Sequence, residues 1–189
     1  MERIRRGDAR AFEQIVNAYW NRLNLYAQGL THDCDSAKDA VQEIFTRVWQ
    51  GRTDWREHGS VRAYLFRAVR NRVIDWERQR RVWERLGARW REAQLWPRTP
   101  AEVLEQNELP AVLQRAIQSL PERRREVFVL AHFEDLTYQE IAEVMNLAPQ
   151  TIANHVSLAL RDLRRTLGPM FPRFATEMTA TQIRQSRPS

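Results

Sequence analysis

The sequence predicts an all-α protein of two small helical domains joined by a linker, the second containing a helix-turn-helix. Apolar residues recur at helical spacing through most of the 189 residues, and no stretch alternates as a strand does. All seven Trp lie between Trp20 and Trp96, and this change of composition indicates two domains. We expect a first domain at 7–91, a linker at 92–110, a second domain at 111–168 and a tail at 169–189.

Charge and composition indicate a polyanionic partner. The net charge is +6, and it comes almost entirely from arginine because Lys38 is the only lysine. A hydrophobic share of 43% suffices for a core. No apolar run approaches the roughly 20 residues of a membrane span, and no signal-peptide core appears, so we expect a cytoplasmic protein.

The first domain is predicted to begin with a helix from Asp8 to about Gly29, followed by a polar loop at Thr31–Ser36. A second helix follows over residues 37–51, ended by Gly51. Its buried face is wide, and it comprises Ala40, Val41, Ile44, Phe45, Val48 and Trp49. Its outer face is acidic and amide-rich near the start, which the helix dipole alone would favour. By pattern alone, a solvated face is favoured over a partner-binding face.

A third helix, beginning at residue 61, is rich in arginine. Residues 61–91 hold ten arginines and three carboxylates, a net +7 that exceeds the charge of the whole chain. The predicted core side comprises Val61, Tyr64, Leu65, Ala68, Val69, Val73 and Trp76. Arginines interleaved with Phe66, Trp76, Trp83 and Trp90 are typical of single-strand binding, where guanidinium groups meet phosphates and rings stack on bases. The alternative is that the arginines form a solvated face and the aromatic residues belong to the core. We favour a core position for Trp76 and a nucleic-acid-binding role for the arginines.

The stretch LWPRTP cannot continue a helix, and it marks the domain boundary. Thr99 and Glu102 form a possible capping box for a new helix, and Pro110 kinks or restarts that helix. Leu120-Pro121-Glu122 opens the next helix. Its apolar residues, expected to pack against the helix-turn-helix, are Val127, Phe128, Leu130 and Ala131.

The segment Thr137–Leu167 predicts that helix-turn-helix. Thr137 and Glu140 form a capping box, Asn146 suits the left-handed turn, and Pro149 suits the first turn of the second helix. The core positions of that helix are Ile152, Val156, Ala159, Leu160, Leu163 and Leu167, and the opposite face carries Gln150, Asn154, Ser157, Arg161 and Arg164. An ordinary αα-hairpin is the alternative. Amides suited to adenine and arginines suited to guanine or phosphate favour DNA binding.

Catalysis and metal binding find little support. The stretch THDCD around Cys34 crowds possible ligands into one loop and lacks the spread of a zinc site. The four histidines, His32, His58, His132 and His155, are scattered without partners at useful spacing. We therefore expect no catalytic residue, metal or cofactor, and no small-molecule substrate. A single cysteine also excludes an internal disulfide.

Five stretches in order resemble the extracytoplasmic-function (ECF) group of the bacterial sigma-70 family, the subunits that give RNA polymerase its promoter choice. They are GDARAFEQIV, AKDAVQEIFTRVW, YLFRAVRNRVIDWERQRR, LPERRREVFVLAHFEDLTYQEIA and TIANHVSLALRDLRRTL, and they cover most of residues 7–167. The segment TIANHVSLAL is similar to the iron-uptake (siderophore-signalling) subgroup. The resemblance implies sigma region 2 in the first domain and sigma region 4 in the second, with a sigma factor's role in transcription initiation.

The resemblance also implies roles for particular residues, and it reverses the solvated-face interpretation of the 37–51 helix. The polymerase-binding residues would be Asp39, Gln42, Glu43 and Phe45, which match D-x-x-Q-E-x-F. The residues that bind and melt the −10 element would be Asn71, Asp75 and Arg78 with Arg67 and Arg70 beside them, and the loop Arg56–Ser60 would receive a flipped base. The −35 element would be read by Gln150, Thr151, Asn154, Ser157 and Arg161. The implied partners are core RNA polymerase, promoter DNA as duplex and melted strand, and an anti-sigma factor.

The second helix of the helix-turn-helix, which would be the recognition helix, has Ala153 and His155 where basic residues are common in the family. We therefore expect fewer phosphate contacts from the start of this helix. Two other classes of function remain as alternatives. An autonomous helix-turn-helix regulator does not explain the 37–51 helix or the arginine-rich middle. A nucleic-acid enzyme such as a nuclease would need clustered carboxylates or a histidine constellation, and the four histidines of this sequence are scattered.

Overall fold

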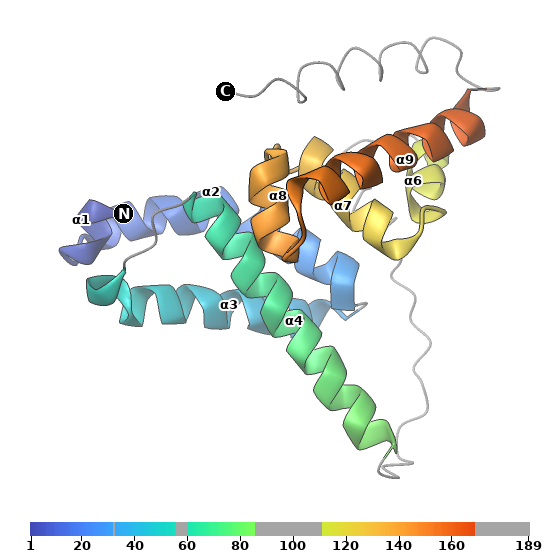
Figure 1. Ribbon diagram of the computed structural model, residues 1–189. Coiled ribbons are helices and arrows are strands. Elements are labelled where there is room, and N and C mark those ends of the chain that lie inside the picture. The colour runs from blue at the N-terminus through green and yellow to red at the C-terminus, as the bar shows by residue number, and fades with distance from the viewer. Residues whose placement is uncertain (32, 56–59, 86–110, 169–189) are drawn as a thin grey trace. The chain divides into compact units, whose positions relative to one another are not determined.

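The computed structural model describes residues 1–31, 33–55, 60–85 and 111–168, without the side chains of 81–85 and 111 (Figure 1). This described part is helical and contains no strand, which confirms the predicted all-α class. The chain divides into two compact units, Met1–Val103 and Leu104–Ser189. Some predictions lie outside the described residues: the linker 92–110, the capping box at Thr99, the break at Pro110, the tail 169–189, and Arg56–Gly59.

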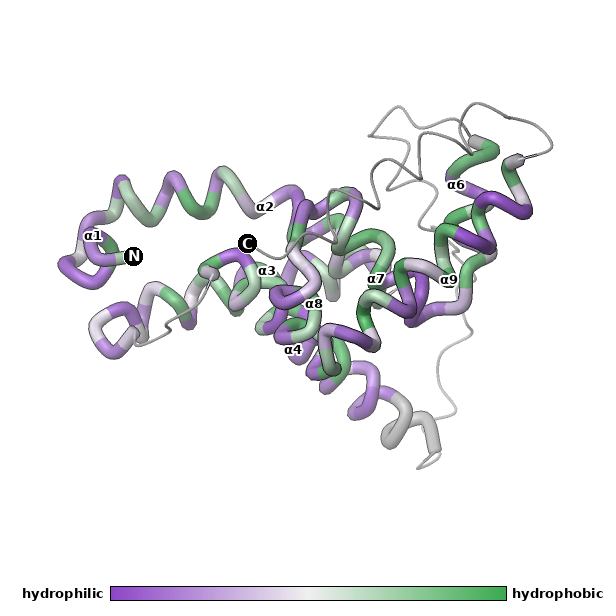
Figure 2. Tube along the Cα trace, turned by 45° about the horizontal axis from the view of Figure 1, so that its top comes forward, coloured by the Kyte–Doolittle hydropathy of each residue, from purple (hydrophilic) through white to green (hydrophobic). Residues whose placement is uncertain are grey.

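The first unit consists of α1 (Glu2–Arg5), α2 (Ala9–Thr31), α3 (Cys34–Gln50), the 3₁₀ turn η1 (Arg52–Asp54) and α4 (Val61–Arg85). Each of α2, α3 and α4 packs against the other two, while α1 lies against α2 and η1. Along these helices hydrophobic and hydrophilic residues alternate with the helical turn, as expected when one face is buried (Figure 2). The sequence pattern did not predict α1, a single turn whose Ile4 is 1% exposed.

The predicted loop at Thr31–Ser36 is shorter than expected. α2 continues to Thr31 and α3 begins at Cys34. Asp33 is the reason, since its side chain accepts hydrogen bonds from the Asp35 and Ser36 backbone N–H groups and so caps α3. Gly51 ends α3, as predicted.

The core of the first unit is aliphatic and aromatic. Its buried members from α2 to α4 include Leu23, Tyr26, Val41, Ile44, Leu65, Phe66, Val69 and Val73. The prediction that Phe66 stacks on bases is wrong, because Phe66 is fully buried with its ring centroid 5.2 Å from that of Tyr26. Trp76 is half-buried.

The second unit consists of α6 (Ala111–Gln118), α7 (Glu122–His132), α8 (Tyr138–Met145) and α9 (Pro149–Leu167). α9 packs against all three others, so it is the central helix of this unit. The buried residues of α7 and α9 include those that the sequence predicted: Val127, Phe128, Leu130, Ala131, Ile152, Val156, Ala159, Leu160, Leu163 and Leu167. Asp162 Oδ2 also accepts from Arg124 Nη1 at 2.6 Å and joins α9 to α7.

Local interactions fix the helix-turn-helix. Both halves of the capping box are present: Glu140 N–H donates to Thr137 Oγ1 at 3.2 Å, and Thr137 N–H donates to Glu140 Oε2 at 2.8 Å. Asn146 adopts the left-handed conformation, with φ 53° and ψ 53°. Pro149 occupies the first turn of α9, where its missing N–H costs nothing. These three features were predicted from the sequence.

Candidate functional site

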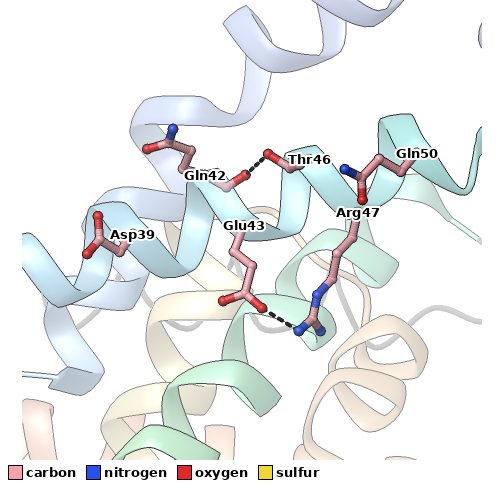
Figure 3. Close-up of a pocket in the computed structure, with 6 residues that line it drawn as sticks. All are labelled: Asp39, Gln42, Glu43, Thr46, Arg47 and Gln50. Carbon is pink, nitrogen blue, oxygen red and sulfur yellow. Dashed lines mark hydrogen bonds and ion pairs between the residues drawn. The ribbon is translucent and has the colours of Figure 1, made fainter.

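One exposed face of α3 carries most of the residues that the family resemblance assigned to polymerase binding. Six residues line an open hollow of about 440 Å³ there: Asp39, Gln42, Glu43, Thr46, Arg47 and Gln50 (Figure 3). Asp39 and Gln42 are exposed, as is Lys38 next to them. The Gln42 backbone carbonyl accepts from the Thr46 hydroxyl at 2.9 Å, and the Gln42 side chain itself is exposed. The face therefore offers one carboxylate and amides to a partner.

Phe45, the fourth residue of that predicted set, points into the core. It is 5% exposed, and its ring centroid lies 6.2 Å from that of Phe12 and 6.1 Å from that of Trp20. Phe45 is therefore placed to hold α3 against α2, and its side chain offers no surface for a partner.

The Glu43 carboxylate lies between two arginines. Oε1 accepts a short hydrogen bond from Arg47 Nη2 on the same helix, and Oε2 accepts from Arg72 Nε of α4 at 2.5 Å. The Arg72 guanidinium carbon also lies over the Trp76 ring, 4.7 Å from its centroid. No local pattern signals the Glu43–Arg72 contact, since 29 positions separate the two residues.

A second hollow of about 470 Å³ lies between α3 and α4. Its lining residues are Ile44, Arg47, Tyr64, Ala68, Asn71, Arg72, Asp75, Arg78 and Gln79. Three of them, Asn71, Asp75 and Arg78, belong to the predicted −10 set, and all three are exposed. Arg78 Nη1 lies 3.7 Å from Asp75 Oδ1. Arg47 lines both hollows, so the α3 face and the α4 groove are adjacent surfaces.

Arg67 and Arg70, which the sequence added to the −10 set, are half-buried and are not among the residues lining this hollow. The Arg67 guanidinium carbon lies 5.9 Å from the Tyr64 ring centroid. Tyr64 in turn packs edge-on against Trp55, with 4.4 Å between centroids. Sequence reasoning placed Tyr64 in the core, whereas the structure places it at the groove.

The predicted −35 residues form one row on α9 in the second unit. Gln150, Asn154, Ser157 and Arg161 are exposed and follow one face of the helix, while Thr151 is half-buried beside them. Gln150 Nε2 donates to Asn154 Oδ1 at 3.3 Å. Ala153 and His155 are both half-buried and lie beside the row.

The THDCD stretch is explained by helix capping. The Ser36 hydroxyl donates a short hydrogen bond to Asp33, and this bond, with the two N–H groups at the start of α3, lowers the pKa of the Asp33 carboxyl. Cys34 is half-buried in the first turn, and His32 lies outside the described residues. Within the ranges that the structure describes, no group of three His, Cys, Asp or Glu side chains could hold a metal ion. None of the described helices is long and apolar enough to cross a membrane.

Two family models match the chain, one to each unit. The model described as Sigma-70 region 2 matches residues 15–82, which include α3 and the described part of the α4 groove. The model described as Sigma-70, region 4 matches residues 111–163, which include the helix-turn-helix except for the last turn of α9. An arginine-rich helical unit followed by a helix-turn-helix unit defines, together with these matches, a transcription initiation factor.

Comparison with similar proteins shows which kind of transcription initiation factor the chain is. The ECF RNA polymerase sigma factor RpoE of Cereibacter sphaeroides is 30% identical over 159 residues, covering 84% of this chain and 87% of the relative. The RNA polymerase sigma-H factor of Pseudomonas aeruginosa is 26% identical over 188 residues, covering 90% of this chain and 93% of the relative. The chain belongs to the sigma-70 family, as an ECF sigma factor that binds core RNA polymerase and directs it to promoters.

Solved structures support the same fold. The sigma factor RpoE from Bartonella quintana, in complex with the anti-sigma factor NepR, superposes with a TM-score of 0.62 at 23% identity, covering 83% of this chain and 96% of that one. CnrH, in complex with the cytosolic domain of CnrY, gives a TM-score of 0.61 at 24% identity, covering 89% and 95%.

Proposed function

We propose that this ECF sigma factor divides promoter recognition between its two units, region 2 at 7–91 and region 4 at 111–168. The first binds core polymerase through the exposed face of α3 and captures the −10 strand along α4. The second reads the −35 duplex with α9. The observation that carries this proposal is the exposed row on α9, which stands on a buried face formed by residues such as Ile152, Val156 and Leu160. A rigid helix with its polar row outward can enter the major groove.

The chemistry of the α9 row suits base reading. Gln150 and Asn154 carry amides, which pair bidentately with adenine edges, and Arg161 suits guanine or phosphate. Thr151 and Ser157 add hydroxyls that serve bases or phosphates. Because Ala153 and His155 stand where basic residues are common in the family, we expect affinity from this helix to depend mostly on Arg161 and on base contacts.

The groove along α4 suits a melted strand. Its guanidinium groups attract phosphates, and Asn71 and Asp75 offer amide and carboxylate groups to base edges. Arg67 and Arg70 add positive charge next to it on α4. The loop Arg56–Ser60 is proposed to receive a flipped base, although only Ser60 of it belongs to the described residues.

Asp39 and Gln42 are proposed as the polymerase contacts on α3, with Phe45 fixing the helix from behind. The protein acts by binding in the cytoplasm and needs no cofactor. Both superposed structures contain a second protein, named an anti-sigma factor in one and the cytosolic domain of CnrY in the other. We propose that an anti-sigma factor likewise restrains this chain. The iron-uptake subgroup stays a prediction.

Binding to core polymerase tests the proposal most directly. The full chain should co-purify with core RNA polymerase, and Asp39→Ala and Gln42→Ala should each weaken the complex. Glu13→Ala, an exposed carboxylate on α2, is the matched control and should bind as the wild type does. Unchanged affinity in both α3 variants would contradict the polymerase face. Salt-sensitive duplex binding by the chain alone, without polymerase binding, would favour an autonomous regulator.

The −35 assignment is tested by sequencing transcript starts made by the holoenzyme and then changing α9. Gln150→Ala or Asn154→Ala should cost about 1–3 kcal/mol of discrimination at one base pair each. Arg161→Ala should instead weaken all sequences alike if it meets phosphate, and reduce the salt slope by about one. Asn17→Ala, an exposed amide on α2, should leave base preference unchanged. Unaltered base preference in both amide variants would remove α9 as the reader.

A further inference from the structure

The Glu43 carboxylate is engaged within the protein on both of its oxygens. Oε1 accepts from Arg47 and Oε2 accepts from Arg72 Nε at 2.5 Å. Of the Glu43 side chain 31% is exposed, and of Arg72 only 22%. Asp39 and Gln42 on the same helix are exposed. Glu43 therefore differs from its neighbours: it also lines the α3 hollow, but both of its oxygens are engaged and one of them is bonded to α4.

Arg72 connects this carboxylate to the DNA-facing part of α4. It precedes Val73, which is the last buried side chain of α4 among residues 61–80, the part of that helix with described side chains. Its guanidinium also packs on Trp76, one turn further on. Asn71, Asp75 and Arg78 lie on the same stretch and line the same groove as Arg72. The Glu43–Arg72 bond is thus placed where α4 passes from the core to the groove.

The two contacts of Glu43 differ in strength. The bond to Arg47 lies within one helix, and its arginine is exposed, so solvent and salt screen it. The bond to Arg72 joins two helices and is half-buried, where charge-assisted bonds are screened less. Stacking on Trp76 restricts the Arg72 side chain before it meets the carboxylate, which reduces the entropy lost on pairing. The Arg72 contact is therefore the one that can fix α4 relative to α3.

We infer that Glu43 is a positioning residue that links the polymerase-binding helix α3 to the DNA-binding helix α4 through Arg72, and that this link supports promoter opening. The inference rests on the proposed roles of α3 and α4. It differs from the role that the D-x-x-Q-E-x-F match implies for Glu43, which is direct contact with polymerase. When polymerase holds α3, the link keeps Asn71, Asp75 and Arg78 in register with the strand to be captured.

The experiment separates polymerase affinity from promoter opening in the full chain. Glu43→Gln, Arg72→Gln and the double variant are assembled with core polymerase. Affinity is measured by fluorescence anisotropy, and opening by permanganate reactivity of unpaired thymines. Asp39→Asn is the matched carboxylate-to-amide control on α3. Arg72→Lys keeps the charge without the Nε donor, so it should show an intermediate opening rate.

Glu43→Gln and Arg72→Gln should change polymerase affinity by less than about threefold. Opening by saturated holoenzyme should slow about tenfold in each, and the double variant should be no slower than the worse single, because both changes break one contact. Asp39→Asn should show the reverse, weaker binding with normal opening at saturation. A purely structural defect would lower both quantities together with the thermal midpoint, and that result would overturn the inference.

Two other results would also overturn it. One is loss of polymerase affinity in Glu43→Gln equal to that in Asp39→Asn, with normal opening at saturation, which would make Glu43 a direct contact. The other is full multiplication of the two single defects in the double variant, which would show that Glu43 and Arg72 act separately. Failure of the proposed polymerase face gives a different result from failure of the inference. In that case Asp39→Asn would not affect polymerase binding, while the Glu43 and Arg72 variants would still report on promoter opening.

Discussion

The turn of the helix-turn-helix depends on the backbone of Asn146. Its φ of 53° lies in the left-handed region, which asparagine adopts at a lower energetic cost than alanine does. The Ala142 carbonyl accepts from the Asn146 N–H and also from the following N–H, that of Leu147, at 3.0 Å, so the chain turns back onto the end of α8. One residue thereby sets the direction in which α9 leaves the turn.

Asn146→Ala should therefore lower the free energy of unfolding by about 1 kcal/mol, and Asn146→Gly should leave it nearly unchanged. Urea unfolding of the full chain, followed by circular dichroism, measures both. Glu143→Ala, on the exposed face of α8, controls for loss of a polar side chain. Equal stability of the alanine and glycine variants would show that the left-handed turn is not under strain.

His132 makes the stability of the second unit depend on pH. Burial disfavours the charged imidazolium and lowers the pKa of His132 below 6.5, and Asp135 offsets this in part. Between the lowered pKa and 6.5 the unfolded chain binds the proton more readily, so stability is lost as pH falls through that range. Hydrogen bonds lower the pKa of Asp8 and Asp33 below 3.8, so their contributions are lost only in stronger acid.

The wild type should accordingly lose more stability than His132→Gln when the pH falls from about 7.5 to about 5.5. Urea titrations of both proteins at the two pH values measure the difference. Asn17→Gln, an exposed change on α2 that removes no titratable group, serves as the control for the glutamine replacement. An identical pH response in wild type and His132→Gln would show that His132 has the same pKa in the folded and the unfolded protein.

Among the helices, α9 combines a buried structural face with the face proposed to read DNA, and the Arg124–Asp162 ion pair joins it to α7. Asp162 and Arg124 are both largely covered, with 16% and 29% of their side chains exposed. Removing the carboxylate leaves a partly buried guanidinium without its strongest acceptor. The same carboxylate lies 3.8 Å from Arg165.

Asp162→Asn should destabilise the protein by about 1–2 kcal/mol in urea unfolding. Glu143→Gln replaces an exposed carboxylate by an amide on the neighbouring helix, and it should cost nearly nothing. If the two variants were equally stable, the α7–α9 pair would contribute as little as a surface ion pair does.

The sequence predicted best those elements whose signals are local. The capping box at Thr137, the turn at Asn146 and the apolar stripe of α9 each lie within a few positions, and the structure confirms all three. The early start of α3 was missed because the Asp33 cap looked like a loop residue. Phe66 was misjudged because helical spacing does not tell which of two adjacent faces is covered, and the Glu43–Arg72 contact joins residues too far apart in sequence for any local pattern.

For the whole molecule, the proposed function makes the two units linked readers of one promoter. Each unit has its own core, and the linkage makes the second binding event intramolecular once polymerase holds the first. The weak contacts of the two units then combine to give specific binding to one promoter. The family models match each unit to its own sigma region, which agrees with this division.

The fold-changes in promoter affinity caused by Asn71→Ala and Gln150→Ala should consequently multiply in the double variant. The two residues belong to different units and share no described partner. Competition binding of holoenzyme to one promoter measures the singles and the double. On a promoter with a scrambled −35 element the Gln150→Ala effect should disappear and the Asn71→Ala effect should persist. A double variant no weaker than the worse single would contradict independent reading.

The exposed Lys38 gives the α3 face a chemical label. It is the only lysine of the chain, and it lies next to Asp39 on the face proposed to meet polymerase. Apart from the terminal amine, an amine-reactive cross-linker has only this place to attach. Any partner peptide recovered on Lys38 by mass spectrometry therefore marks what docks beside Asp39, without a substitution in the protein.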